Sequence, residues 1–168
     1  LGARTGAEVY HCLKHDPECV DVVEVYPDFK HMARNHFESL GCGCWTDPRV
    51  RIITGTACQA AEKLAAAPVR YDMAVIDLTS RTCVAPLEAL LPILDRVMTE
   101  DAVLVFQLGE MVVEGMAAPA HTLAALKAAF ATVQPMACPD GVRGVHVLAV
   151  CSREPLDGAI RTTIPASL

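Results

Sequence analysis

Short apolar segments rich in β-branched residues alternate with segments of helical periodicity along most of this chain. Short apolar runs bounded by turn residues favour strands, and apolar residues three and four positions apart favour helices. Strands are expected at residues 20–25, 50–54, 71–77, 102–107, 133–138 and 145–152. Helices are expected at residues 8–14, 28–40, 57–66, 86–98 and 119–132. This alternation predicts an α/β domain with a mainly parallel sheet, and the Pro139-Asp140-Gly141 turn predicts an antiparallel closing pair.

The composition fits a single folded domain and argues against several classes of function. Of 168 residues, 52% are hydrophobic and 20% are charged, which excludes a disordered chain and supplies a sizeable core. The net charge is −6 and the lysines and arginines do not cluster, so we expect no nucleic-acid partner. Polar and charged residues interrupt the most apolar stretch, 102–130, so we expect no membrane partner.

Eight cysteines are spread over the chain, and their spacing bears on metal binding, disulfides and cellular compartment. The one close pair is Cys42 and Cys44 in a glycine-rich segment, whereas zinc sites usually show paired C-x2-C spacings. The histidines show no metal-binding spacing with carboxylates. A secreted disulfide scaffold would be smaller and poorer in core residues. We therefore expect reduced, mostly buried cysteines, no metal and a cytoplasmic location.

Polar side chains stand at the ends of three expected strands. Glu24 lies one residue before the end of the first strand, Asp77 ends the third and Gln107 ends the fourth. In an open α/β sheet, ligands bind beyond the carboxyl ends of the strands, so we expect Glu24 and Asp77 to face one cleft. The alternative roles are a solvated acid for Glu24, a capping acid for Asp77 and a loop tie for Gln107.

A glycine-containing segment precedes the first expected helix. Gly2 and Gly6 frame a loop before residues 8–14, and Glu24 follows Gly6 by 18 residues. That distance is near the roughly 20 residues at which an acid meets the ribose diol in nucleotide-binding folds. The loop and the acid together predict a nucleoside ligand.

Six stretches of the chain, taken in order, resemble the spermidine synthase family of polyamine aminopropyltransferases. They are residues 12–17 (CLKHDP), 20–27 (VDVVEVYP), 47–55 (DPRVRIITG), 71–80 (YDMAVIDLTS), 102–107 (AVLVFQ), and Gly141 followed by the strand ending in Cys151-Ser152-Arg153. The resemblance covers residues 2–155. It implies a Rossmann-like, adenosylmethionine-dependent methyltransferase fold. It also implies decarboxylated S-adenosylmethionine, or S-adenosylmethionine itself, as co-substrate, and a small amine such as putrescine as acceptor, without a metal.

The resemblance carries the nucleoside site over residue by residue. The family's GGGDGG loop is matched by residues 2–7, with Thr5 at the acid that holds the donor's aminopropyl nitrogen. The family's ribose-binding acid is matched by Glu24, and its adenine-reading Asp is matched by Thr56. The nucleoside-binding residues that the resemblance implies are Gly2, Gly6, Glu24, Gly55 and Thr56.

The family's D-S/T-S/T-D motif is matched by Asp77-Leu78-Thr79-Ser80. The resemblance implies that Asp77 is the general base, which removes a proton from the attacking amine. It implies that Ser80, standing where the family has its second Asp, and Gln107 bind the acceptor.

Neutral residues replace three acids of the family pattern, at Thr5, Thr56 and Ser80. A cationic amine that loses a charge-assisted hydrogen bond is bound less tightly by about 1.5–3 kcal/mol. Three functions therefore stay open. They are an aminopropyltransferase-like enzyme, an S-adenosylmethionine-dependent methyltransferase on the same fold, and a non-catalytic relative that acts by protein association.

The resemblance also implies the order of the strands. In this fold the strand before the glycine loop is central, so the strands that end near Glu24 and Asp77 should flank it rather than pair with each other. Family members carry an N-terminal β-rich domain and often form dimers, which implies a homodimer through a part outside these residues. Residues 1–155 are then expected to form the Rossmann domain, without folding autonomously, and residues 156–168 a tail.

Overall fold

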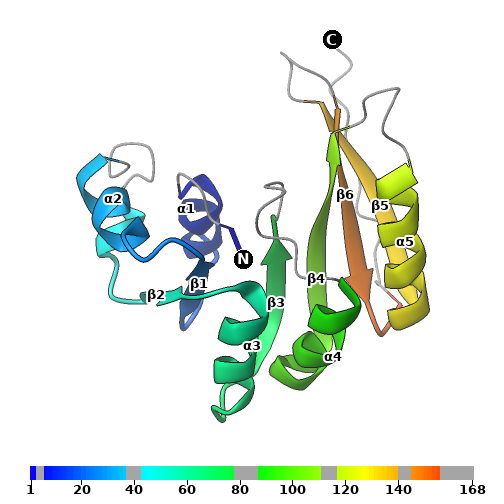
Figure 1. The fold of residues 1–168 in the computed structure, drawn as a ribbon, viewed down its shortest axis with the longest axis horizontal. Helices are drawn as coiled ribbons and strands as arrows, with labels where there is room; N and C mark the ends of the chain where they lie inside the picture. Colours follow the sequence, from blue (N-terminus) through cyan, green and yellow to red (C-terminus); the bar gives the residue numbers. More distant parts are fainter. Residues whose placement is uncertain (3–5, 37–42, 78–86, 111–116, 140–144, 156–168) are drawn as a thin grey trace.

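The fold is described from a computed structural model, which places all residues except 3–5, 37–42, 78–86, 111–116, 140–144 and 156–168 (Figure 1). In chain order the elements are α1 (Ala7–Leu13), β1 (Val20–Glu24), α2 (Phe29–His36), the 3-10 helix η1 (Cys44–Thr46), β2 (Val50–Thr54), α3 (Ala57–Ala65), β3 (Tyr71–Ile76), α4 (Leu87–Val97), β4 (Met98–Glu110), α5 (Ala117–Ala129), β5 (Thr132–Pro139) and β6 (Val145–Ser152).

The strands form a small parallel pair and a larger mixed sheet. β1 pairs with β2 in parallel, and the larger sheet has the order β3-β4-β6-β5. Within it β3 and β4 are parallel, whereas β6 runs antiparallel to both β4 and β5. Figure 1 shows α1 and α2 with the pair and α4 and α5 with the larger sheet. The predicted α/β fold with an antiparallel closing pair is confirmed.

The largest differences from the expected boundaries are in β4 and α5. β4 extends from Met98 to Glu110, beyond the expected 102–107, because Met98 pairs with Tyr71 and the ladder with β6 continues to Glu110. The helix expected at 119–132 ends at Ala129, since Thr132 already pairs with Ser152 in the β5–β6 ladder. In both cases hydrogen bonds to a distant strand outweigh the local residue pattern.

Two apolar clusters hold the fold together. The larger one lies between the β3-β4-β6-β5 sheet and helices α3 to α5, with Ile76, Leu104 and Leu126 fully buried. The smaller one joins α1, β1, α2 and η1 around Trp45, which is only 1% exposed and contacts the edge of the Phe29 ring. Trp45 is therefore a core residue.

The cysteines are less buried than expected. Cys44 and Cys151 are buried, whereas Cys12, Cys19, Cys58 and Cys138 are partly exposed. These six are all free thiols, and burial raises the pKa of the Cys151 thiol to about 11. The other two positions fall outside the described residues. Among the described residues the expectation of mostly buried cysteines is therefore wrong, because Cys58 only borders the larger cluster and the other three partly exposed cysteines belong to neither cluster.

β1 and β3 do not pair with each other; the first two residues of the chain lie between their ends (Figure 1). The Leu1 nitrogen donates to the Val75 carbonyl (2.7 Å), and the Leu1 carbonyl accepts from the Asp77 amide (2.9 Å). This is the bonding pattern of a parallel bridge. The Gly2 amide donates to the Val23 carbonyl of β1 (3.2 Å). The strands that end near Glu24 and Asp77 are therefore separated, as the implied strand order requires.

The opposite ends of the same two strands are joined by side chains. The Tyr71 hydroxyl, at the start of β3, donates to the Asp21 carboxylate of β1. The Asp21 side chain is only 1% exposed, and it also accepts two hydrogen bonds of 2.6 Å from the Arg51 guanidinium of β2. Burial and the neighbouring carboxylate raise the pKa of Tyr71 well above its ordinary value. The hydroxyl therefore stays protonated and keeps donating across the space between the strands.

We expect Tyr71→Phe to lower the free energy of unfolding by about 1.5–3 kcal/mol, because it removes a hydrogen bond to a buried carboxylate. Denaturant unfolding measures the effect. Tyr26→Phe is the matched control, since Tyr26 is 57% exposed and should change stability very little. Equal stability of the two variants would contradict this role for Tyr71.

Candidate functional site

Polar residues gather at the carboxyl ends of β1, β2 and β3 and at Gln107, which lies within β4 rather than at its end. Glu24 ends β1 and pairs with Thr54, which ends β2, so Gly55 follows directly beside it. Ile76 ends β3 and pairs with Phe106 of β4, so Asp77 and Gln107 follow side by side. Carboxyl ends of parallel strands meet at one edge of the sheet, which is where open α/β folds bind ligands. This edge is the candidate site.

Gly2 and Gly6 bring backbone close to this edge. Gly2 has φ 83°, and a Cβ on it would overlap the carbonyl oxygen of Asp77. Gly6 has φ 96°, and a Cβ there would lie 2.6 Å from the Trp45 ring. Both positions require glycine, because a side chain is excluded by positive φ and by its neighbours. Thr5, between them, lies outside the described residues.

Glu24 is a buried acid rather than the solvated one of the alternative interpretation. It is 9% exposed, and its carbonyl accepts from the Gly55 amide at 2.9 Å. The Leu1–Gly2 backbone bonds to Val75 and Asp77 on one side and to Val23 on the other, so Glu24 and Asp77 follow strands that flank this segment.

Gly55 and Thr56 form the turn from β2 into α3. Gly55 has φ 150°, and Thr56 is the first residue of a capping box with Gln59. The Thr56 hydroxyl accepts from the backbone amide of Gln59 (3.3 Å), and the side-chain oxygen of Gln59 accepts from the backbone amide of Thr56 (3.1 Å). Thr56 thus begins α3 in the way expected of an N-cap. A role for Gly55 and Thr56 toward adenine stays a prediction.

Asp77 belongs to a chain of polar contacts that crosses from β3 to β6. The Gln107 amide nitrogen, turned toward Asp77, donates to both carboxylate oxygens, at 3.0 Å to Oδ2. A carboxylate can only accept, so these partners fix the orientation of the amide. In this orientation the side-chain oxygen of Gln107 lies 3.3 Å from the His146 Nδ1. Gln107 therefore contacts Asp77, the expected general base, directly. The alternative role of Gln107, a loop tie, does not include this contact.

His146 is not among the site residues expected from the sequence. It lies in a strand without any motif, and only the β4–β6 register, which pairs Gln107 with Leu148, brings it near the site. Ser80, expected beside the acceptor, lies outside the described residues. Over the residues placed by the structure, no group of three or more His, Cys, Asp or Glu side chains could hold a metal ion. Among these residues, no helix is long and apolar enough to cross a membrane.

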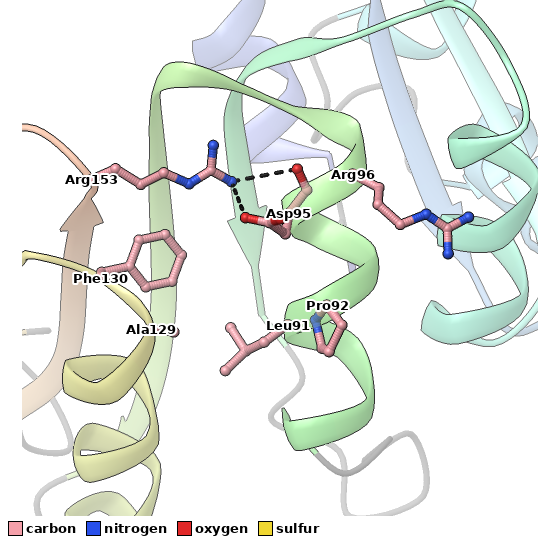
Figure 2. Close-up of a pocket in the computed structure, with 7 residues that line it drawn as sticks. All are labelled: Leu91, Pro92, Asp95, Arg96, Ala129, Phe130 and Arg153. Carbon is pink, nitrogen blue, oxygen red and sulfur yellow. Dashed lines mark hydrogen bonds and ion pairs between the residues drawn. The ribbon is translucent and has the colours of Figure 1, made fainter.

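A pocket of about 400 Å³ lies away from this site (Figure 2). It is lined by Leu91, Pro92, Asp95, Arg96, Ala129, Phe130 and Arg153. Its two arginines are already paired, Arg153 with Asp95 at 2.7 Å and Arg96 with Glu62 at 3.2 Å. α4 ends at Val97 and β4 begins at Met98, so the pocket is at the amino end of β4, opposite the candidate site.

Comparison with known proteins identifies relatives of this chain. The family model described as the spermine/spermidine synthase domain matches residues 2–157. A search of curated proteins finds no match. Spermidine synthase from Thermotoga maritima superposes with a TM-score of 0.73 at 18% identity, over 89% of this chain and 50% of that one. A spermidine synthase in complex with the transition-state analogue AdoDATO gives 0.70 at 19% identity, with coverages of 89% and 50%.

A methyltransferase is also similar. Human methyltransferase-like protein 13, in complex with SAH, superposes with a TM-score of 0.67 at 20% identity, over 91% of this chain and 70% of that one. At such identities the structural likenesses establish the Rossmann-like methyltransferase fold and nothing finer. The chain spans about half the length of the two spermidine synthases it matches.

We expect Gly2→Ala to destabilise the protein by at least about 1 kcal/mol more than Gly109→Ala, as overpacking typically costs 1–3 kcal/mol. Both glycines have positive φ, but a Cβ on Gly109 meets nothing within 4 Å, whereas one on Gly2 overlaps Asp77. Comparison with Gly109→Ala therefore separates the cost of a side chain at positive φ from the cost of the steric overlap with Asp77. Denaturant unfolding of the two variants gives the difference, and equal losses would show that Gly2 does not need its close approach to Asp77.

Proposed function

We propose, because this chain belongs to the spermine/spermidine synthase family, that it transfers an aminopropyl group from decarboxylated S-adenosylmethionine to a small amine. The observation that carries the proposal is the arrangement at the carboxyl edge. Glu24 is buried and Asp77 is half-buried at the ends of the two strands that flank the Leu1–Gly2 segment, and Gln107 contacts Asp77.

The nucleoside would be held mainly by Glu24. A carboxylate accepts hydrogen bonds from both ribose hydroxyls, and burial keeps water from competing for it. Gly2 lets the backbone approach the ligand closely, while Gly55 and Thr56 would lie against the adenine. A similar spermidine synthase is in complex with AdoDATO and the human methyltransferase with SAH, so an adenosyl ligand suits this fold in both cases.

Asp77 would act as the general base of the transfer. The neutral amine attacks the carbon beside the donor's sulfonium, a C–N bond forms, and the C–S bond breaks to leave methylthioadenosine. The amine proton passes to the Asp77 carboxylate. A base placed within hydrogen-bond reach contributes roughly 10²–10⁴-fold to such a step. Ser80 and Gln107 would orient the acceptor.

Thr5 and Ser80 shape the substrate preference. Each replaces an acid of the family pattern, so a cationic amine would bind less tightly by about 1.5–3 kcal/mol at each position. That corresponds to roughly a tenfold to hundredfold loss of affinity at each. We infer weak amine affinity and a low rate at limiting amine. A homodimer and a cytoplasmic location, compatible with the free thiols, complete this proposal.

The second candidate is an S-adenosylmethionine-dependent methyltransferase. It is favoured by the neutral residue at Thr5, where the family pattern has the acid that holds the donor's aminopropyl nitrogen, and by the similarity to a methyltransferase in complex with SAH. Product analysis separates the two, because aminopropyl transfer releases methylthioadenosine and methyl transfer releases SAH. A third candidate, a non-catalytic relative acting by association, would release neither.

We expect Asp77→Asn to lower methylthioadenosine release from decarboxylated S-adenosylmethionine and putrescine by roughly 10²–10⁴-fold, because the amine proton loses its acceptor. Nucleoside binding should remain. The assay uses the whole protein, with Asp72→Asn as control, since Asp72 is an exposed acid on the same strand. Full turnover in Asp77→Asn would overturn the proposed role of this acid.

A further inference from the structure

His146 lies on the same side of the sheet as Gln107. In the β4–β6 ladder Gln107 is opposite Leu148, and His146 is two residues from Leu148 along β6. Side chains two apart on a strand share a face, so His146 and Gln107 are diagonal neighbours. The register shifts between Gln107 and Gly109, which has φ 114°. Such bulges often re-aim side chains beside functional sites.

The Gln107 amide transmits the state of one neighbour to the other. When its nitrogen donates to an ionised Asp77, its oxygen faces His146, and only a proton on Nδ1 completes the contact. When the amide is reversed, its oxygen faces Asp77 and its nitrogen faces Nδ1. That arrangement needs a protonated Asp77 and a bare Nδ1. The orientation of the amide and the tautomer of His146 are therefore coupled.

We propose that His146 is a positioning residue whose Nδ1–H holds Gln107 with its amide nitrogen on the ionised Asp77 carboxylate. This inference rests on the proposed function, in which Asp77 must be ionised to accept the amine proton. In this arrangement His146 acts on Asp77 through Gln107. Its contribution is to keep the Asp77 carboxylate oriented, through Gln107, before the amine arrives.

A pair of substitutions separates this role from packing. In His146→Asn the side-chain amide keeps an N–H near the place of Nδ1, whereas His146→Leu removes the donor. We expect His146→Leu to lower kcat by about tenfold or more, because a misplaced reacting group slows the chemical step by such factors. The KM for the nucleoside donor should stay unchanged. His146→Asn should retain most of kcat. His121→Leu is the control, because His121 is exposed and pairs with Glu88.

A second measurement does not depend on turnover. Nitrogen-15 NMR of the imidazoles in the resting protein should show His146 protonated at Nδ1. Gln107→Leu should return it to the Nε2–H tautomer that free imidazole prefers. A bare Nδ1 in the resting protein, or equal kcat in His146→Asn and His146→Leu, would overturn this inference alone. Full turnover in Asp77→Asn would overturn the proposed function and this inference together.

Discussion

The backbone bridge between β1 and β3 is the constraint on which the site depends. Leu1 bonds to both sides of Ile76 in β3, and Gly2 bonds to Val23 in β1. These bonds set the separation of two strands that otherwise share no ladder, and so they set where Glu24 and Asp77 lie. Gly2 is required because its Cα approaches the Asp77 carbonyl too closely for any side chain. At the other end the Asp21–Tyr71 contact holds the same two strands.

The carboxyl edge keeps acids at some positions of the family pattern and has neutral residues at others. This difference decides which parts of a ligand the edge can bind tightly. Glu24 is buried and Asp77 is contacted by the Gln107 amide, so two acids remain for a nucleoside and for one proton. The family's further acids are neutral here, at Thr5, Thr56 and Ser80. The site therefore keeps the groups that would bind the uncharged ribose and take the proton. At Thr5 and Ser80 it lacks the acids that would hold cationic nitrogens, and these acids would have contributed affinity rather than chemistry.

The positions of the helices and strands could be predicted from the sequence better than the contacts between them. The apolar runs ending at Glu24, Asp77 and Gln107 became strands because their residues suit a buried sheet, and parallel pairing then placed their ends at one edge. The length of β4 and the end of α5 were missed, because they depend on β6, which is distant in sequence. The contact of His146 with Gln107 depends on a bulged register that no local pattern encodes.

Calorimetric titration of the whole protein with methylthioadenosine tests most directly whether this edge is a nucleoside site. The wild type and Glu100→Gln, an exposed control acid, should bind with similar affinity. Glu24→Gln should lose affinity by roughly tenfold to a hundredfold, since the hydrogen bonds from the ribose would no longer meet a charge. Undiminished binding by Glu24→Gln, or no binding by the wild type, would contradict a nucleoside site between Glu24 and Asp77.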